Sequence, residues 1–300
     1  MSQVADVNQE GLGEDSARRA AVVQRAMSEI SHIATLPEIT LKSIKTVEDP
    51  KSTASDLHEI IANDPALCAR ILKLVNSAFY GLPGQIGSIN RAIVLLGLNA
   101  VKNIAIAASL AKLFRGGRIS PNFSAKDLWK YSIAVGAAVR LLAEKVGRKL
   151  PDEAFLAGLM HDIGVVVELQ AERVKLVEAL ELKDREGISL LQAEQKVMGA
   201  THQDFGRALC DKWKFPKSFA YVCGFHHTPM AVERDIRTLV ALVHVGTILA
   251  ARHDFGFPGV VESTELDPEV MRYLELTDTH ITAVSEKIPE AYEVADQLLG

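Results

Sequence analysis

Three stretches of this sequence carry side chains that could bind a metal ion or move a proton. They hold the pair His161-Asp162, the single His202 and the pair His226-His227. Imidazole and carboxylate groups are common ligands of zinc, iron, manganese and nickel. Because the five residues come from separate stretches, their spacing alone does not decide between a metal centre and unrelated side chains.

The pair His161-Asp162 lies inside an apolar stretch that runs from Ala157 to Val167. An ionised carboxylate in such surroundings costs several kcal/mol unless a cation, a metal or strong hydrogen-bond donors lie against it. One interpretation is therefore a metal-binding or proton-handling pair. The other is an aspartate bonded to free N–H groups or an arginine, beside a neutral packed histidine. The pair His226-His227 could likewise sit near a helix C-terminus simply because the helix dipole favours it there.

The elements that must position these side chains are predicted to be helices. Aromatic residues make up only 6% of the 300 residues, and the apolar stretches are rich in Ala, Leu, Val and Ile, which favours helices over a β-sandwich. We find no convincing strand alternation. Apolar spacing and capping residues predict an all-α protein, with helices near 65–78, 88–96, 99–114, 124–147, 151–164, 171–184, 189–198, 201–213, 217–226, 237–251, 267–275 and 279–299.

The clearest internal boundary is the Gly- and Pro-containing segment 115–122. We therefore expect an N-terminal helical subdomain over 19–115 and a helical core over 123–251. Residues 1–18 are predicted to be a disordered tail, and residues 252–300 a C-terminal helical extension.

Charge and composition exclude several classes of function. The net charge is −5, with 33 basic and 38 acidic residues, so no basic footprint for nucleic acid is present, although a small anionic ligand remains compatible. The three cysteines form no C-x-x-C pair. The polar N-terminus lacks the features of a signal peptide, and the most hydrophobic run, Leu239–Ala251, is shorter than the ~20 residues of a membrane span. We expect a cytoplasmic protein without a membrane or nucleic-acid partner.

A series of ordered motifs resembles the HDOD domains, a subgroup of the HD superfamily of metal-dependent phosphohydrolases. The resemblance covers about residues 33 to 250. It is carried by Leu36-Pro37, Ile-Ile-Ala-Asn-Asp-Pro-Ala-Leu at 60–67, Leu-Val-Asn-Ser-Ala at 74–78, Ile-Asn-Arg-Ala-Ile at 89–93, Leu96-Gly97, Leu128-Trp129, Ala-Gly-Leu-Met-His-Asp-Ile-Gly at 157–164, Thr201-His202, and Trp213-x-x-Pro216 leading to His226-His227. It implies an HD-like multi-helix bundle preceded by an N-terminal helical subdomain.

The related HD-GYP phosphodiesterases have a two-metal site that can be compared residue by residue. Its HD pair corresponds to His161 and Asp162, a later histidine to His202, and its HH pair to His226 and His227. This resemblance implies that one metal position, formed by the bridging Asp162 with the last three histidines, keeps its side chains. We therefore expect at most one divalent transition-metal ion, which would be Fe, Mn, Zn or Ni.

The other metal position departs from the family pattern at two ligands. Tyr131 stands where the first histidine is expected, and Thr247 stands where the final aspartate is expected. Thr228-Pro229-Met230 follows the HH pair in place of a Gly-Tyr-Pro motif. Hydrolysis with two metals needs an activated bridging water and a second Lewis acid, so hydrolysis of a cyclic dinucleotide is not expected.

The leading hypothesis is a non-catalytic regulatory protein of bacterial signalling that binds a partner protein and is gated by a metal or a small phosphorylated ligand. The chain shows no receiver, kinase, cyclase or DNA-binding region, so an output would pass through another molecule. The alternative is a metal-dependent phosphohydrolase that acts on a nucleotide or cyclic nucleotide with one ion. A third interpretation is a scaffold in which the histidines form only a buried hydrogen-bonded cluster.

Overall fold

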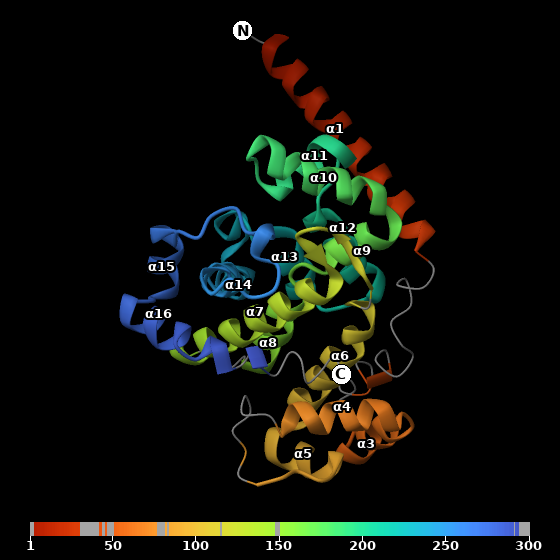
Figure 1. Cartoon of the computed structure of the whole chain (residues 1–300), viewed down its shortest axis with the longest axis vertical. Coiled ribbons are helices and arrows are strands. Elements are labelled where there is room, and N and C mark those ends of the chain that lie inside the picture. The colour runs from red at the N-terminus through yellow and green to blue at the C-terminus, as the bar shows by residue number, and fades with distance from the viewer. Residues whose placement is uncertain are drawn as a thin grey trace.

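The computed structural model describes residues 3–30, 42–43, 46, 51–76, 82, 84–114, 116–147, 151–290 and 292–293. Almost all regular structure in these residues is helical (Figure 1), which confirms the all-α fold. Leu36-Pro37, the last two residues of the motif at 74–78 and the end of the predicted helix at 279–299 lie outside the described residues.

Four helices form a small N-terminal bundle at one end of the molecule (Figure 1). They are α3 (Ala54–Ala62), α4 (Pro65–Val75), α5 (Ile89–Leu96) and α6 (Leu98–Leu110). The side chains of Thr53, Asp64 and Ser88 accept hydrogen bonds from the free N–H groups at the starts of α3, α4 and α5, as short polar caps do. Helix α6 packs against both this bundle and the core, so it connects the two parts.

The core is built around two packed groups of helices. The first contains α7 (Ala125–Lys145), α8 (Pro151–Met160) and α14 (Arg234–Arg252). The second contains α9 (Ile163–Ala171), α12 (His202–Trp213) and α13 (Lys217–Phe225), with α10 (Arg173–Glu186) and α11 (Leu190–Met198) on its outer side. Helices α15 (Pro268–Leu274) and α16 (Asp278–Ser285) pack on the side of the first group, against α14 and α7 (Figure 1). Short 3-10 turns lie at Pro229–Ala231, between α13 and α14, and at Pro258–Val260, between α14 and α15.

The structure differs from the sequence-based expectations at two places. The prediction of no strands misses a short antiparallel hairpin of β1 (Arg118–Ser120) and β2 (Phe123–Ser124), too short to show an alternating pattern. The prediction of a disordered tail over 1–18 misses α1 (Gln3–Glu29). Ala26, Met27 and Ile30 bury their side chains against the core. Once that contact fixes one end of a helix, adding residues at the other end is inexpensive.

Helix α1 also changes the expected grouping of the chain. It crosses α9 and α12 of the core and does not join α3–α6 (Figure 1). The N-terminal bundle among the described residues therefore begins near Ala54, whereas the expected subdomain began at residue 19.

One segment, Glu153–Ala171, is apolar and long enough to span a membrane by composition alone. In the structure it consists of two helices, α8 and α9, which are separated by a turn at His161-Asp162. Within its most apolar window, 83% of the residues are buried inside the protein. Glu153–Ala171 is therefore a buried segment of the protein core.

Candidate metal centre

The pair His161-Asp162 occupies the turn between α8 and α9. Both side chains are fully buried, as the apolar flanks predict. His161 Nδ1 lies 2.6 Å from the carbonyl oxygen of Gly158. A carbonyl only accepts hydrogen bonds, so Nδ1 carries the proton and Nε2 holds the lone pair. That Nε2 atom lies 2.9 Å from Asp162 Oδ2.

His202 and His226 bring two further ring nitrogens to Asp162. His202, the first residue of α12, has Nε2 at 3.6 Å from Asp162 Oδ1. His226, which ends α13, has Nε2 at 3.3 Å from the same oxygen. Its Nδ1 faces the Val222 carbonyl at 3.1 Å, so Nε2 is again the atom with the lone pair. Three helix ends thus direct imidazoles at one carboxylate.

His227 completes the cluster. Its Nε2 lies 3.2 Å from His202 Nε2, and its side chain is half-buried, whereas His202 and His226 are buried. Among the described residues, two overlapping groups of ligand atoms lie within 4.8 Å of one another. They are His202 with His226 and His227, and His161 with Asp162 and His226. The structure therefore brings together all five residues singled out from the sequence.

The buried atoms of this cluster need a cation or a proton between them. His161 Nε2, His226 Nε2 and both oxygens of Asp162 are buried and have no aligned hydrogen-bond partner in the described part of the chain. A ring lone pair directed at a carboxylate oxygen is repulsive unless a positive charge lies between the two. The donor set therefore fits a transition-metal ion held by imidazole and carboxylate, and its binding of such an ion stays a prediction.

The pKa values of the histidines in the cluster are shifted in opposite directions. Burial disfavours the charged form of His202, but the Glu194 carboxylate outweighs burial and raises the pKa to about 9. Burial lowers the pKa of His226 to about 4 and that of His227 well below its usual value. Burial also opposes ionisation of Asp162, but the surrounding imidazoles dominate and hold its pKa well below the usual range. Without a metal, His202 is therefore the protonated ring that faces Asp162.

Two buried carboxyl groups behind His202 are not among the residues predicted from the sequence. Glu194 on α11 and Glu168 on α9 are fully buried. Glu194 accepts hydrogen bonds from His202 Nδ1 and from the His202 backbone N–H. The sequence does contain a signal for Glu194. It lies four residues after Leu190 and four before Met198, on the same face of the helix, and both of these residues are buried. A charged residue on the buried stripe of a helix marks a polar site.

Tyr131 and Thr247, the two positions that depart from the family pattern, are joined to each other. The Tyr131 hydroxyl donates to the Thr247 carbonyl oxygen over 3.0 Å, and the Thr247 hydroxyl donates to the His244 carbonyl. Burial and the nearby Asp162 raise the pKa of Tyr131 well above its usual value, so the phenol stays neutral. This pair ties α7 to α14 beside His161 and supplies no anionic ligand.

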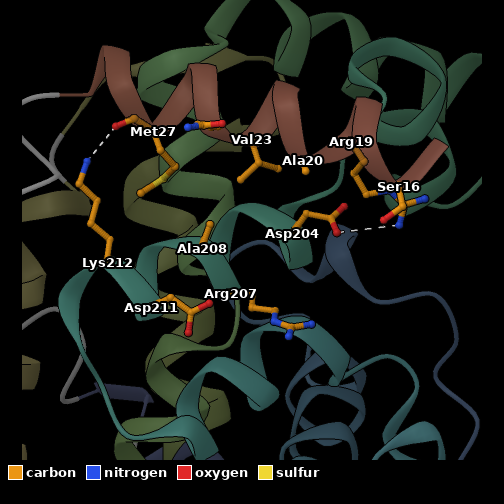
Figure 2. Close-up of a pocket in the computed structure, with 11 residues that line it drawn as sticks. Ser16, Arg19, Ala20, Val23, Met27, Asp204, Arg207, Ala208, Asp211 and Lys212 are labelled. Carbon is orange, nitrogen blue, oxygen red and sulfur yellow. Dashed lines mark hydrogen bonds and ion pairs between the residues drawn. The ribbon is translucent and has the colours of Figure 1, made fainter. Parts of the chain in front are cut away.

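One cavity lies outside this cluster, between α1 and α12 (Figure 2). It measures about 490 Å³ and has a small apolar floor with charged residues around it. In Figure 2, Arg19 faces Asp204, and Lys212 reaches the carbonyl of Met27. None of the five candidate ligands lines this cavity.

Comparison with known proteins gives a family model and distant relatives. The model of the HDOD domain matches residues 33–229. An uncharacterized protein of Treponema pallidum (strain Nichols) is 26% identical over 215 residues, which are 71% of this chain and 41% of that protein. The chain thus spans less than half the length of this curated relative.

Solved structures resemble nearly the whole chain. A crystal structure of an HDOD domain protein of unknown function from Geobacter sulfurreducens has a TM-score of 0.79 and 27% identity, and covers 93% of this chain and 98% of its own. A candidate phosphohydrolase from Shewanella amazonensis SB2B has a TM-score of 0.73 and 22% identity, with the same coverage. The second likeness concerns the fold alone.

Proposed function

The chain belongs to the HDOD domain family, and from this premise we propose that it is a non-catalytic regulatory protein of bacterial signal transduction. In this proposal it holds one divalent transition-metal ion, and it acts by binding a partner protein in a manner gated by that ion or by a small phosphorylated ligand. The partner belongs to the same signalling system.

The observation that carries the proposal is the hydrogen bond between Tyr131 and Thr247. A second metal position would need an imidazole and a carboxylate there, and a neutral phenol bonded to a backbone carbonyl offers neither. His161 and Asp162 alone are too few to hold a second divalent ion firmly. Two-metal phosphoryl chemistry depends on two Lewis acids that act together, and the ligands for the second ion are missing here.

The remaining donors support a single ion. Asp162, His202, His226 and His227 would hold it, with the first three fully or almost fully buried. Such an ion would supply positive charge next to Asp162, and its ligands would come from the ends of α8, α12 and α13. Because His202 is protonated without it, binding releases a proton. An ion that links three helix ends can change the surface that they present, which is the basis for gating.

The first test is the metal content of the protein, measured by elemental mass spectrometry after removal of any histidine tag. We expect close to one transition-metal ion per chain, and almost none in His202→Ala. His253→Ala is the matched control, because His253 bonds to Ser285 outside the cluster and should keep the ion. Circular dichroism verifies that each variant is folded. A metal-free wild-type protein would favour the scaffold interpretation.

The gating step has its own test. Partner binding should fall when a chelator removes the ion, and it should return when the metal is added back. Binding that ignores both treatments would contradict a role for the ion in gating.

One observation favours a second candidate function, that of a metal-dependent phosphohydrolase acting on a nucleotide or cyclic nucleotide. The unpartnered oxygens of Asp162 could accept a metal whose chemistry is Lewis-acid activation of water and phosphate. A hydrolysis screen with added Mn²⁺ or Fe²⁺ separates the two functions. Turnover in wild type that disappears in Asp162→Ala would overturn the non-catalytic proposal.

A further inference from the structure

Glu194 is bound to His202 by two separate hydrogen bonds. Its carboxylate oxygens lie 2.9 and 3.0 Å from His202 Nδ1. One of them also accepts the His202 backbone N–H over 3.0 Å. Glu194 is fully buried, so water does not compete for these donors. The ring and the backbone of the first residue of α12 are therefore held by one side chain.

This arrangement distinguishes His202 from the other rings of the cluster. His161 and His226 place Nδ1 against backbone carbonyls, which are neutral acceptors. His202 alone among these three places Nδ1 against a carboxylate. Such a bond fixes the tautomer and the ring orientation, and it makes the opposite nitrogen a stronger electron donor. That opposite nitrogen, Nε2, is the atom directed at Asp162 and His227.

A second buried carboxyl group lies behind Glu194. Burial and the adjacent Glu194 raise the pKa of Glu168 well above its usual value, which favours the neutral form of Glu168. The other acidic groups near Glu168 are Asp162 and Asp204, which also favour its neutral form. Glu194 is the member of this buried pair that contacts His202.

We propose that Glu194 is the positioning residue of the metal centre, holding His202 with Nε2 directed into the cluster and thereby setting the affinity of the site for a divalent cation. This inference rests on the proposed function, because it assumes that the cluster binds an ion. It adds a residue outside the ligand set, on a helix that contributes no ligand.

The decisive variant is Glu194→Gln. The side chain keeps its shape and one acceptor oxygen, but it loses the charge and turns an NH₂ group toward a donor. We expect the dissociation constant for Zn²⁺, measured by competition with a chromophoric chelator, to rise by about 10- to 100-fold. The visible absorption of bound Co²⁺ should also shift, since it reports the ligand geometry. Glu194→Asp, which restores the charge, should recover part of the affinity.

Glu168→Gln is the matched control. It replaces another fully buried carboxyl group in the same region, and the amide resembles the neutral form that the surroundings of Glu168 favour. We expect its Zn²⁺ affinity and Co²⁺ spectrum to stay close to those of wild type. A urea unfolding curve for each variant separates a loss of fold from a loss of affinity.

The outcomes separate this inference from the proposed function. A wild-type protein that binds neither Zn²⁺ nor Co²⁺ would overturn both. A wild-type protein that binds zinc, with Glu194→Gln binding it equally tightly and with an unchanged Co²⁺ spectrum, would overturn the role of Glu194 alone. Equal losses in the Glu194 and Glu168 variants would also overturn it, because they would indicate a general effect of buried charge.

Discussion

The backbone of Gly164 touches the backbone of His202. A Cβ atom added at Gly164 would lie 1.8 Å from the His202 carbonyl oxygen and 2.7 Å from the backbone nitrogen of Gly206. No side chain other than hydrogen fits at this crossing of α9 and α12. Because Asp162 precedes Gly164 by two residues, the close approach of the two helices is what brings Asp162 and His202 together.

We therefore predict that Gly164→Ala separates the two halves of the candidate centre. Overpacking in a well-packed core costs ~1–3 kcal/mol, and a backbone clash belongs at the upper end of that range. Urea unfolding should show a loss of ~3 kcal/mol, and metal content should fall with it. Gly87→Ala is the control, because nothing lies within 4 Å of its added Cβ. An unchanged unfolding midpoint in Gly164→Ala would refute the close contact.

Local signals in the sequence predict the helices well. The segments 189–198 and 201–213 correspond to α11 and α12, which begin at Leu190 and His202. Capping boxes at Ser189 and Thr201 mark these starts, and a capping box is a property of four consecutive residues. The start of α1 has no such local signal, and the buried part of this helix depends on a distant contact made by Ala26 and Met27.

The candidate centre is less accessible from the sequence. His161 and Asp162 stand out because apolar residues flank them, whereas their distances to His202 and His226 depend on how three helix ends meet. Glu194 is hidden in a different way. It lies eight residues before His202, and only the buried stripe of α11 indicates that it points inward. The hydrogen bond between Tyr131 and Thr247 spans 116 residues and has no local signature.

Asn76 is predicted to stabilise the N-terminal bundle. Its side-chain amide donates to the carbonyls of Leu72 and Ile86, and its oxygen accepts the Ile86 N–H. Asn76→Ala should lower the free energy of unfolding by ~2 kcal/mol, because each such bond contributes about 1 kcal/mol. Thermal unfolding measures this. Asn63→Ala, which removes a single exposed bond to Glu59, should cost clearly less, and equal losses would contradict the bridging role.

Tyr131→Phe tests the bond that replaces the second metal position. The variant removes the second hydrogen bond to the Thr247 carbonyl oxygen, which lies inside α14 and also faces the helical N–H four residues on. The net contribution of one such bond is ~1 kcal/mol. Urea unfolding should show that loss, while the metal content should remain that of wild type. Loss of the ion in Tyr131→Phe would mean that this phenol supports the remaining site directly.

The double variant Tyr131→His with Thr247→Asp is the complementary gain of function. It supplies an imidazole and a carboxylate beside His161 and Asp162, so elemental analysis after loading with Mn²⁺ should find more metal per chain than in wild type. Each single variant should add less, because three ligands hold an ion less firmly than four. Identical metal content in wild type and the double variant would show that these two positions do not limit the number of ions.

The stability of the metal-free protein should fall on both sides of neutrality. His202 has a pKa of about 9 in the folded protein, above its ordinary 6.5, so its contribution is complete below pH 6.5 and is lost as the pH rises through 9. His226 has a pKa of about 4, so its contribution is present above pH 6.5 and is lost as the pH falls through 4. Each shift corresponds to at most ~3 kcal/mol.

Urea unfolding midpoints at pH 5, 7 and 9.5 in the presence of a chelator measure the loss of stability at acid and at alkaline pH. In His202→Gln, which carries no titrating ring, the unfolding midpoint should change less between pH 7 and 9.5, while its fall between pH 7 and 5 should remain. Saturating Zn²⁺ should also oppose the alkaline loss in wild type, because the ion takes the place of the proton on Nε2. A wild-type midpoint that is constant from pH 7 to 9.5 without metal would show that Glu194 does not hold a proton on His202.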